Sequence, residues 1–104
     1  MNEDKNFKQV LFSIGLARKA GKVISGTDSV CDEIRKNKVL LVICSFDVSD
    51  NTRKKISDCC KHHNVKLHFC EFSKETLGKS IGKSFSACIG ITDKNLSELI
   101  TRNL

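Results

Sequence analysis

The chain has 104 residues, of which 39% are hydrophobic, and a formal net charge of +6 from 18 Lys and Arg against 12 Asp and Glu. This length fits a single domain over residues 1–104, because two smaller domains would each bury too little apolar surface. The longest apolar run, residues 39–44, is far shorter than the roughly 18 residues of a membrane span. The first residues are acidic and do not resemble a signal peptide, so the sequence predicts a cytoplasmic protein.

The first predicted element is a helix over residues 6–20. Its apolar residues recur with the i, i+3, i+4, i+7 spacing of a buried helix face: Phe7, Val10, Leu11, Ile14 and Ala17, widened by Phe12 and Leu16. A short strand over residues 23–25 and a turn at Gly26 follow. The next helix extends to about residue 37, and either Thr27 or Asp28 is able to cap its start.

The second half of the chain continues the alternation of strands and helices. Residues 39–44 are a continuous apolar run, which predicts a strand covered on both faces. A third helix extends to about residue 63, with a buried stripe of Thr52, Ile56, Cys59, Cys60 and His63. Strands are predicted over residues 66–70 and 87–91, and Ser73 and Asp93 each open a helix. This order predicts an α/β domain with helices on both faces of a small sheet.

The six cysteines raise the question of disulfides or metal binding, but they contain no C-x-x-C pair. In a cytoplasmic protein the thiols are reduced, and Cys44 and Cys88 lie in apolar runs, where cysteine behaves as a small core residue. The cluster Cys59, Cys60, His62 and His63 is the one metal-like candidate. On a helix it offers two ligands per face, fewer than the four of a structural zinc site. We therefore expect no metal and no cofactor, and a metal or redox protein built on this cluster stays a third alternative.

No residue pattern predicts catalysis. Gly78, Lys79 and Ser80 match the end of a phosphate-binding Walker motif. The motif also requires a glycine five residues before Gly78, however, and Ser73 occupies that position in a segment predicted to be helical. The protein is therefore predicted not to be an enzyme. Its positive charge favours a polyanionic partner. All six aromatic residues are Phe and most occupy core-like positions, which favours recognition of RNA shape by backbone amides and basic side chains over base stacking.

Four sequence blocks carry a family resemblance over most of the chain: residues 15–26 (GLARKAGKVISG), 41–52 (LVICSFDVSDNT), 73–83 (SKETLGKSIGK) and 89–93 (IGITD). They resemble the kink-turn RNA-binding ribosomal protein family, the superfamily of the archaeal seventh and eukaryotic thirtieth large-subunit proteins. Within it, the small bacterial YlxQ-type branch is the most similar. The resemblance implies a three-layer α-β-α sandwich around a mixed four-stranded sheet, which agrees with the pattern of elements.

The resemblance also implies where RNA binds. In the family, the start of the second helix enters the widened groove of a sharply bent RNA, and the loop before the last strand packs against a flipped-out nucleotide. The RNA-binding residues implied by these matches and by nearby basic groups are Lys22, Ser25, Gly26, Thr27, Asp28, Ser29, Arg35, Lys36, Lys79, Lys83, Ser84 and Phe85. The chain departs from the family at Asp32, where a Lys is common, and at Ser29, where Glu or Gln is common.

The resemblance implies a monomeric RNA-binding protein that recognises a kink-turn or similarly bent structured RNA, ribosomal RNA included. Its setting would be the ribosome or another ribonucleoprotein. Domains of this fold also occur fused to RNA methyltransferases. The alternative is therefore an RNA-binding accessory subunit for an RNA-modifying enzyme, which would supply the catalytic domain that this short chain lacks.

Overall fold

The computed structural model describes residues 2–104, with side chains from Phe7 onward. The elements follow one another in the order α1 (Asn2–Lys19), β1 (Val23–Ser25), α2 (Thr27–Arg35), β2 (Leu41–Cys44), α3 (Asp50–His63), β3 (Lys66–Phe69), α4 (Lys74–Ser80), β4 (Cys88–Ile91) and α5 (Lys94–Arg102). Within this described range no helix is both long and apolar enough to cross a membrane.

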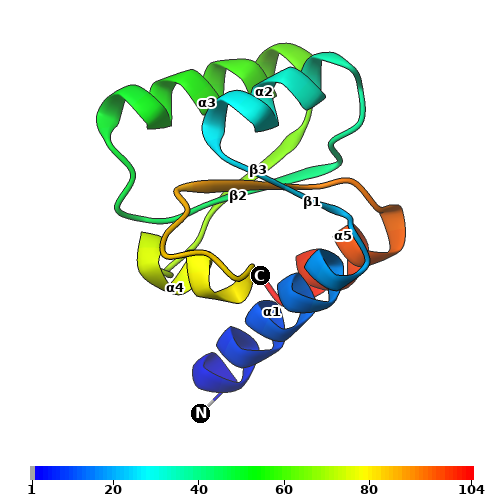
Figure 1. Cartoon of the computed structure of the whole chain (residues 1–104), viewed down its shortest axis with the longest axis vertical. Helices are drawn as coiled ribbons and strands as arrows, with labels where there is room; N and C mark the ends of the chain where they lie inside the picture. Colours follow the sequence, from blue (N-terminus) through cyan, green and yellow to red (C-terminus); the bar gives the residue numbers. More distant parts are fainter. Residues whose placement is uncertain (1) are drawn as a thin grey trace.

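The four strands form one mixed sheet in the order β1-β4-β2-β3. Strand β4 is antiparallel to both of its neighbours, whereas β2 and β3 are parallel. Helices α2 and α3 cover one face of the sheet, and α1, α4 and α5 cover the other (Figure 1). The predicted α-β-α sandwich with a mixed four-stranded sheet is therefore confirmed.

Strand β2 shows why its sequence is apolar at every position. Its side chains alternate between the two faces, so Leu41 and Ile43 pack in the core under α1, α4 and α5. Val42 and Cys44 pack in the second core, under α2 and α3. All four residues are completely buried, as expected for a strand with helices on both sides.

The apolar stripe of α1 is narrower than the sequence predicts. Val10, Ile14 and Ala17 are buried, but Phe12 is 65% exposed and Leu16 is 39% exposed. The prediction that these two residues widen the buried stripe is wrong, because α1 lies in an outer layer and turns only one side toward the sheet (Figure 1). The helix also begins at Asn2, four residues before the predicted start.

The expectation that most phenylalanines occupy the core is also wrong. Phe72 is buried, but Phe46 is 56% exposed and Phe85 is 65% exposed, in addition to Phe12. Phe46 and Phe85 lie outside the helices and strands, in segments where hydrophobic periodicity carries no signal. The protein therefore has exposed Phe rings on which an unpaired base could stack.

Most predicted boundaries lie within a few residues of those in the structure. Ser73 and Asp93 cap α4 and α5 as predicted, each accepting a hydrogen bond from the amide three residues ahead. Helix α2 ends at Arg35 rather than near residue 37, because Asn37 adopts a left-handed backbone with φ of 60°. The third-helix stripe is half right: Ile56 and Cys60 are buried, whereas the remaining members, Thr52, Cys59 and His63, are half-buried.

Candidate nucleic-acid interface

Helix α2 begins with an uncapped turn directly after the short strand β1. Gly26 is its N-cap, with φ of 98° and ψ of 138°, and no side chain accepts a cap hydrogen bond. The prediction that Thr27 or Asp28 caps the helix is therefore wrong, because both residues lie inside its first turn. A side chain at Gly26 would meet nothing within 4 Å, so the backbone is open to a partner on this side. The first-turn amides can thus donate to an anion or a base acceptor.

The loop between α4 and β4 is held tightly against α4. The Lys83 amide donates to the Gly78 carbonyl at 2.9 Å, and the Ser86 amide donates to the Lys74 carbonyl at 2.9 Å. Gly78 permits this approach, because a Cβ there would lie only 2.4 Å from the Phe85 Cα atom. The Phe85 side chain is left mostly exposed on a backbone that cannot move freely.

The start of α2 and the α4–β4 loop meet at the end of strand β1. The Ser25 and Ser86 hydroxyls lie 3.1 Å apart, and the Ser86 hydroxyl also donates to the Cys88 carbonyl at 3.2 Å. The Gly26 amide donates to the same Cys88 carbonyl at 3.0 Å. Two segments that lie about 60 residues apart in the sequence therefore form one continuous surface.

An open hollow of about 520 Å³ lies on this surface, beside α2. Four of the predicted RNA-binding residues line it: Ser25, Ser29, Lys36 and Lys83. The carboxylate residues Asp32 and Glu33 line it as well. Val23 and Ile24 complete the lining, so the hollow is partly apolar and of mixed charge rather than uniformly basic.

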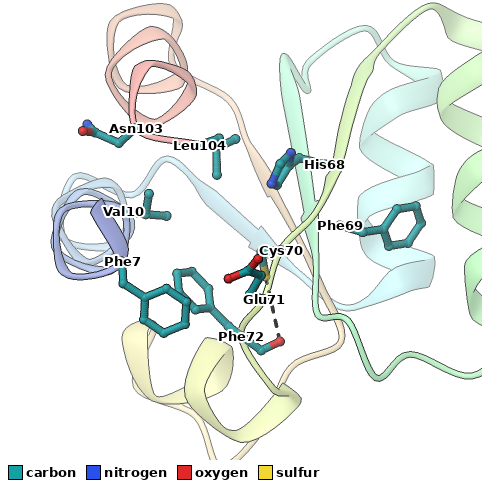
Figure 2. Close-up of a pocket in the computed structure, with 9 residues that line it drawn as sticks. All are labelled: Phe7, Val10, His68, Phe69, Cys70, Glu71, Phe72, Asn103 and Leu104. Atoms are coloured by element: carbon teal, nitrogen blue, oxygen red, sulfur yellow. Dashed lines mark hydrogen bonds between the residues drawn. The ribbon is translucent and has the colours of Figure 1, made fainter. Parts of the chain in front are cut away.

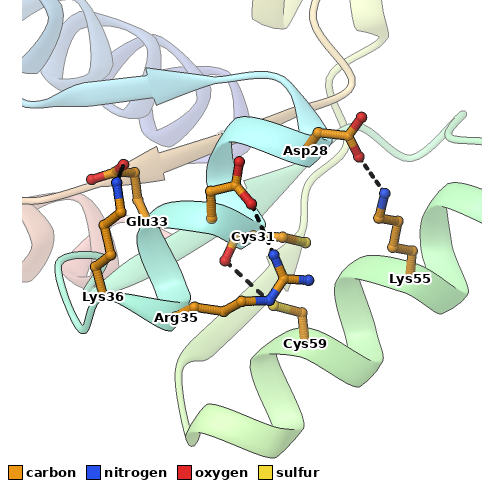
Figure 3. A network of polar contacts seen from close by, with 8 residues as sticks. Asp28, Cys31, Glu33, Arg35, Lys36, Lys55 and Cys59 are labelled. Carbon is orange, nitrogen blue, oxygen red and sulfur yellow. Dashed lines mark hydrogen bonds and ion pairs between the residues drawn. The ribbon is translucent and has the colours of Figure 1, made fainter.

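Each acidic residue of α2 is paired with a basic side chain. Arg35 and Asp32 form an ion pair at 2.8 Å, and Lys36 and Glu33 form another at 3.4 Å. Lys55 of α3 reaches across to Asp28 in the third pair, as Figure 3 shows. Exposed pairs of this kind contribute little to stability, so a phosphate can compete for the basic partner.

Lys55 places a positive charge beside the Asp28 carboxylate at the start of α2. Its hydrogen bond to the Asp28 carboxylate, reinforced by its charge, holds the pKa of Asp28 below the ordinary value and raises that of Lys55. The negative charge that would otherwise repel phosphate at this helix terminus is therefore partly neutralised. Sequence reasoning did not include Lys55 in the site, since it lies 27 residues from Asp28 on another helix.

The remaining predicted residues are placed less closely together. Lys22 lies at the far end of β1 from Gly26, roughly 13 Å along the strand. Lys79 is exposed in the last turn of α4. Arg18 of α1 is a basic residue that the predicted site does not include. Its guanidinium lies in the space that a side chain at Gly82 would occupy. The Gly15–Gly26 sequence block contains Arg18, but only the fold shows that it reaches the α4–β4 loop.

Three members of the metal-like cluster line a separate groove between α2 and α3, whereas Cys60 is buried beneath it. Cys59, Asp58, His62 and His63 lie there with Cys31, whose carbonyl accepts a long 3.9 Å contact from the Cys59 thiol. Burial raises the pKa of Cys31 to about 11 and that of Cys60 to about 12, which keeps these thiols neutral. Across the described residues, no group of three or more His, Cys, Asp or Glu side chains is arranged to hold a metal ion.

A further hollow of about 320 Å³ lies between the start of α1, the edge strand β3 and the C-terminal residues (Figure 2). Phe7, Phe72 and Leu104 supply apolar walls. Cys70 also lines it, but burial raises the pKa of this thiol to about 11, so it offers no ionised nucleophile. No predicted RNA-binding residue lines this hollow.

Comparisons with known proteins agree with this architecture. Residues 8–100 match the sequence model of the ribosomal protein L7Ae/L30e/S12e/Gadd45 family. A protein of Bacillus subtilis (strain 168) named RNA-binding protein YlxQ is 40% identical over 84 residues, which cover 81% of this chain and 83% of that protein. An Enterococcus faecium protein of the same name is 35% identical over 98 residues, or 94% of this chain and 92% of that one.

Solved structures show the same fold. A Bacillus halodurans C protein described as having unknown function superposes with a TM-score of 0.87 at 28% identity, covering 91% of this chain and 95% of that one. The Giardia lamblia 15.5kD RNA binding protein superposes with a TM-score of 0.78 at 17% identity, covering 95% and 84%. The match over residues 8–100, together with the identity to the two YlxQ proteins, confirms the resemblance: this chain belongs to the ribosomal protein L7Ae/L30e/S12e/Gadd45 family.

Proposed function

We propose that this protein binds RNA without catalysing a reaction, and that it recognises a kink-turn or similarly bent structured RNA, ribosomal RNA included. The observation that carries the proposal is the junction at β1, where the uncapped start of α2 meets the α4–β4 loop through Ser25 and Ser86. Backbone amides at a helix start and a mostly exposed Phe on a fixed loop suit a groove with an unpaired nucleotide beside it. The YlxQ relatives, which are named RNA-binding proteins, support the same class of partner.

The mixed charge of the site favours recognition of shape over simple electrostatic attraction. Asp28, Asp32 and Glu33 would weaken binding to an arbitrary polyanion. Binding must then depend on how well the amides of α2 and the loop at residues 83–86 fit the RNA. We therefore expect a monomer to bind a bent RNA more tightly than a straight duplex of the same length.

The test compares a kink-turn RNA with a straight duplex of equal length and charge at several salt concentrations. We expect the bent RNA to bind at least about tenfold more tightly, a difference of about 1.4 kcal/mol, at every salt concentration. Equal affinities throughout would refute recognition of shape and leave only charge-driven binding.

A matched pair of charge reversals tests the location. Lys83 lies on the hollow, whereas Lys94 begins α5, which follows the opposite end of β4. Lys83→Glu should weaken binding and reduce the salt dependence, whereas Lys94→Glu, with the same change in net charge, should leave both unchanged. If the two variants lose affinity equally, the RNA does not bind at this site.

A further inference from the structure

The β2–α3 loop begins beside the proposed RNA surface and carries an exposed aromatic ring. Phe46 is 56% exposed, although the residues on either side of it are held in place. The Ser45 amide donates to the Ala87 carbonyl at 2.9 Å, and the Phe46 amide donates to the Phe72 carbonyl at 3.2 Å. The Asp47 carboxylate accepts from the Lys74 amide at 3.1 Å. A ring on such a backbone loses little conformational freedom when a partner packs on it.

Strand order places this loop at the same end of the sheet as the other two segments of the site. Strand β2 ends where β4 begins, and β4 lies between β2 and β1. Ser45 is paired with Ala87, which lies between Ser86 and Cys88, and the Cys88 carbonyl binds the Gly26 amide. Two strand spacings, about 10 Å, therefore separate Gly26 from the start of the Phe46 loop.

The loop around Phe46 contains acids and no basic residue. Asp47 follows it directly, and Ser49 and Asp50 then open α3. The Asp47 and Asp50 carboxylates would repel phosphate, so we expect the loop to contribute to RNA binding mainly through its aromatic ring. A ring that stacks on a base adds affinity with little dependence on base identity or on salt.

On these grounds, and building on the proposed function, we propose that Phe46 is a second stacking platform of the RNA site. With Phe85, it lets the protein hold two unpaired bases of the bent RNA, one on each ring. The preferred RNA would then present at least two extruded nucleotides at the bend. The sequence favoured shape recognition over such stacking because most Phe residues were assigned to the core.

The experiment uses the full chain and the kink-turn RNA, with each unpaired nucleotide replaced in turn by fluorescent 2-aminopurine. In the complex with the wild-type protein, 2-aminopurine fluorescence should be quenched at two of the unpaired nucleotide positions. Phe46→Ala should restore it at one of them and weaken binding by about 5- to 150-fold, with an unchanged salt slope. Phe46→Trp, which keeps a ring, should bind within about threefold of the wild type. Phe85→Ala should restore fluorescence at the other position.

Phe12→Ala is the matched control, because Phe12 is also mostly exposed but belongs to α1, which covers the opposite face of the sheet from α2. Wild-type affinity of Phe46→Ala, or an equal loss in Phe12→Ala, would overturn the proposal. If Phe46→Ala binds RNA weakly but leaves the fluorescence quenching unchanged, the proposal is also overturned. The ring would then make an apolar contact other than stacking on a base. If the wild type does not prefer the bent RNA, the proposed function fails. The stacking role of Phe46 is then tested separately, by measuring whether Phe46→Ala restores 2-aminopurine fluorescence in a single-stranded RNA.

Discussion

Gly78 and Gly15 allow one substitution to be tested with opposite expected outcomes. Both lie inside helices, where Ala is favoured over Gly by about 1 kcal/mol. A Cβ at Gly15 would lie 3.7 Å from the Ser80 carbonyl oxygen, an ordinary contact. A Cβ at Gly78 would lie 2.4 Å from the Phe85 Cα and 2.6 Å from its carbonyl carbon. Gly15→Ala should therefore stabilise the protein by up to about 1 kcal/mol.

Gly78→Ala should instead destabilise it. To restore an ordinary separation of 3.4 Å, the loop must move by about 1 Å, which strains the bonds from Lys83 to Gly78 and from Ser86 to Lys74. Overpacking of this kind costs about 1–3 kcal/mol, and the helix gain offsets about 1 kcal/mol, so we expect a net loss of roughly 1 kcal/mol. Displacement of Phe85 should also weaken RNA binding about tenfold, close to the loss of one stacking contact.

Urea unfolding and RNA titration on both variants measure these effects. The expected pattern is a higher unfolding midpoint for Gly15→Ala with unchanged affinity, and a lower midpoint for Gly78→Ala with reduced affinity. If Gly78→Ala keeps the wild-type midpoint and affinity, the close approach of loop and helix does not position Phe85.

Three further substitutions probe the start of α2. Lys55→Gln should weaken RNA binding more than Lys54→Gln on the same helix, because it leaves the Asp28 carboxylate without its basic partner. NMR titration of Lys55→Gln should show the Asp28 pKa rising toward its ordinary value of 3.8. Since that pKa is depressed in the folded state, the pair's stabilisation is present at neutral pH and disappears as the pH falls below about 3.8. Asp32→Lys should tighten binding and steepen its salt dependence, whereas an unchanged slope would place this face away from phosphate. Gly26→Ala should lower stability by about 1–3 kcal/mol in urea unfolding, because φ of 98° is unfavourable for Ala.

The sequence predicts best those features that depend on neighbouring residues. Ser73 and Asp93 are helix caps because each side chain binds an amide three residues ahead, a purely local contact. The apolar run ending at Cys44 predicts a strand buried on both faces because that pattern follows directly from its burial. Local chemistry and hydrophobic period therefore predicted most of the elements and the helices on both faces of the sheet, and the family resemblance added the mixed four-stranded sheet.

Contacts between distant segments were not predictable in this way. Asp28 looks like a helix cap by position, but Lys55 on another helix binds its carboxylate. Gly78 resembles part of an incomplete Walker motif in the sequence. In the structure, the absence of a side chain at Gly78 allows the Phe85 backbone to pack against α4. Phe46 is exposed in the loop between β2 and α3, where no hydrophobic period predicts which side chains are buried.

The same pairing of charges determines how strongly salt should affect RNA binding. A net charge of +6 would suggest about six phosphate contacts and a slope of log K against log salt near −5. Arg35, Lys36 and Lys55 each form an ion pair with an acidic side chain, however. Lys36 and Lys83 are the basic residues that line the hollow, and among the described residues Lys83 forms no ion pair.

With the exposed Lys79 of α4 added to Lys83, we expect about two effective phosphate contacts and a slope near −2 for the bent RNA, with most of the remaining affinity insensitive to salt. Titrations between about 50 and 200 mM salt measure the slope, and Asp32→Ala, which frees Arg35, should make it steeper by up to about 1. A wild-type slope near −5 would mean that RNA displaces all three acidic partners on binding. In that case the free-state ion pairs around α2 would not describe the bound surface, and electrostatic attraction rather than shape and stacking would dominate its affinity.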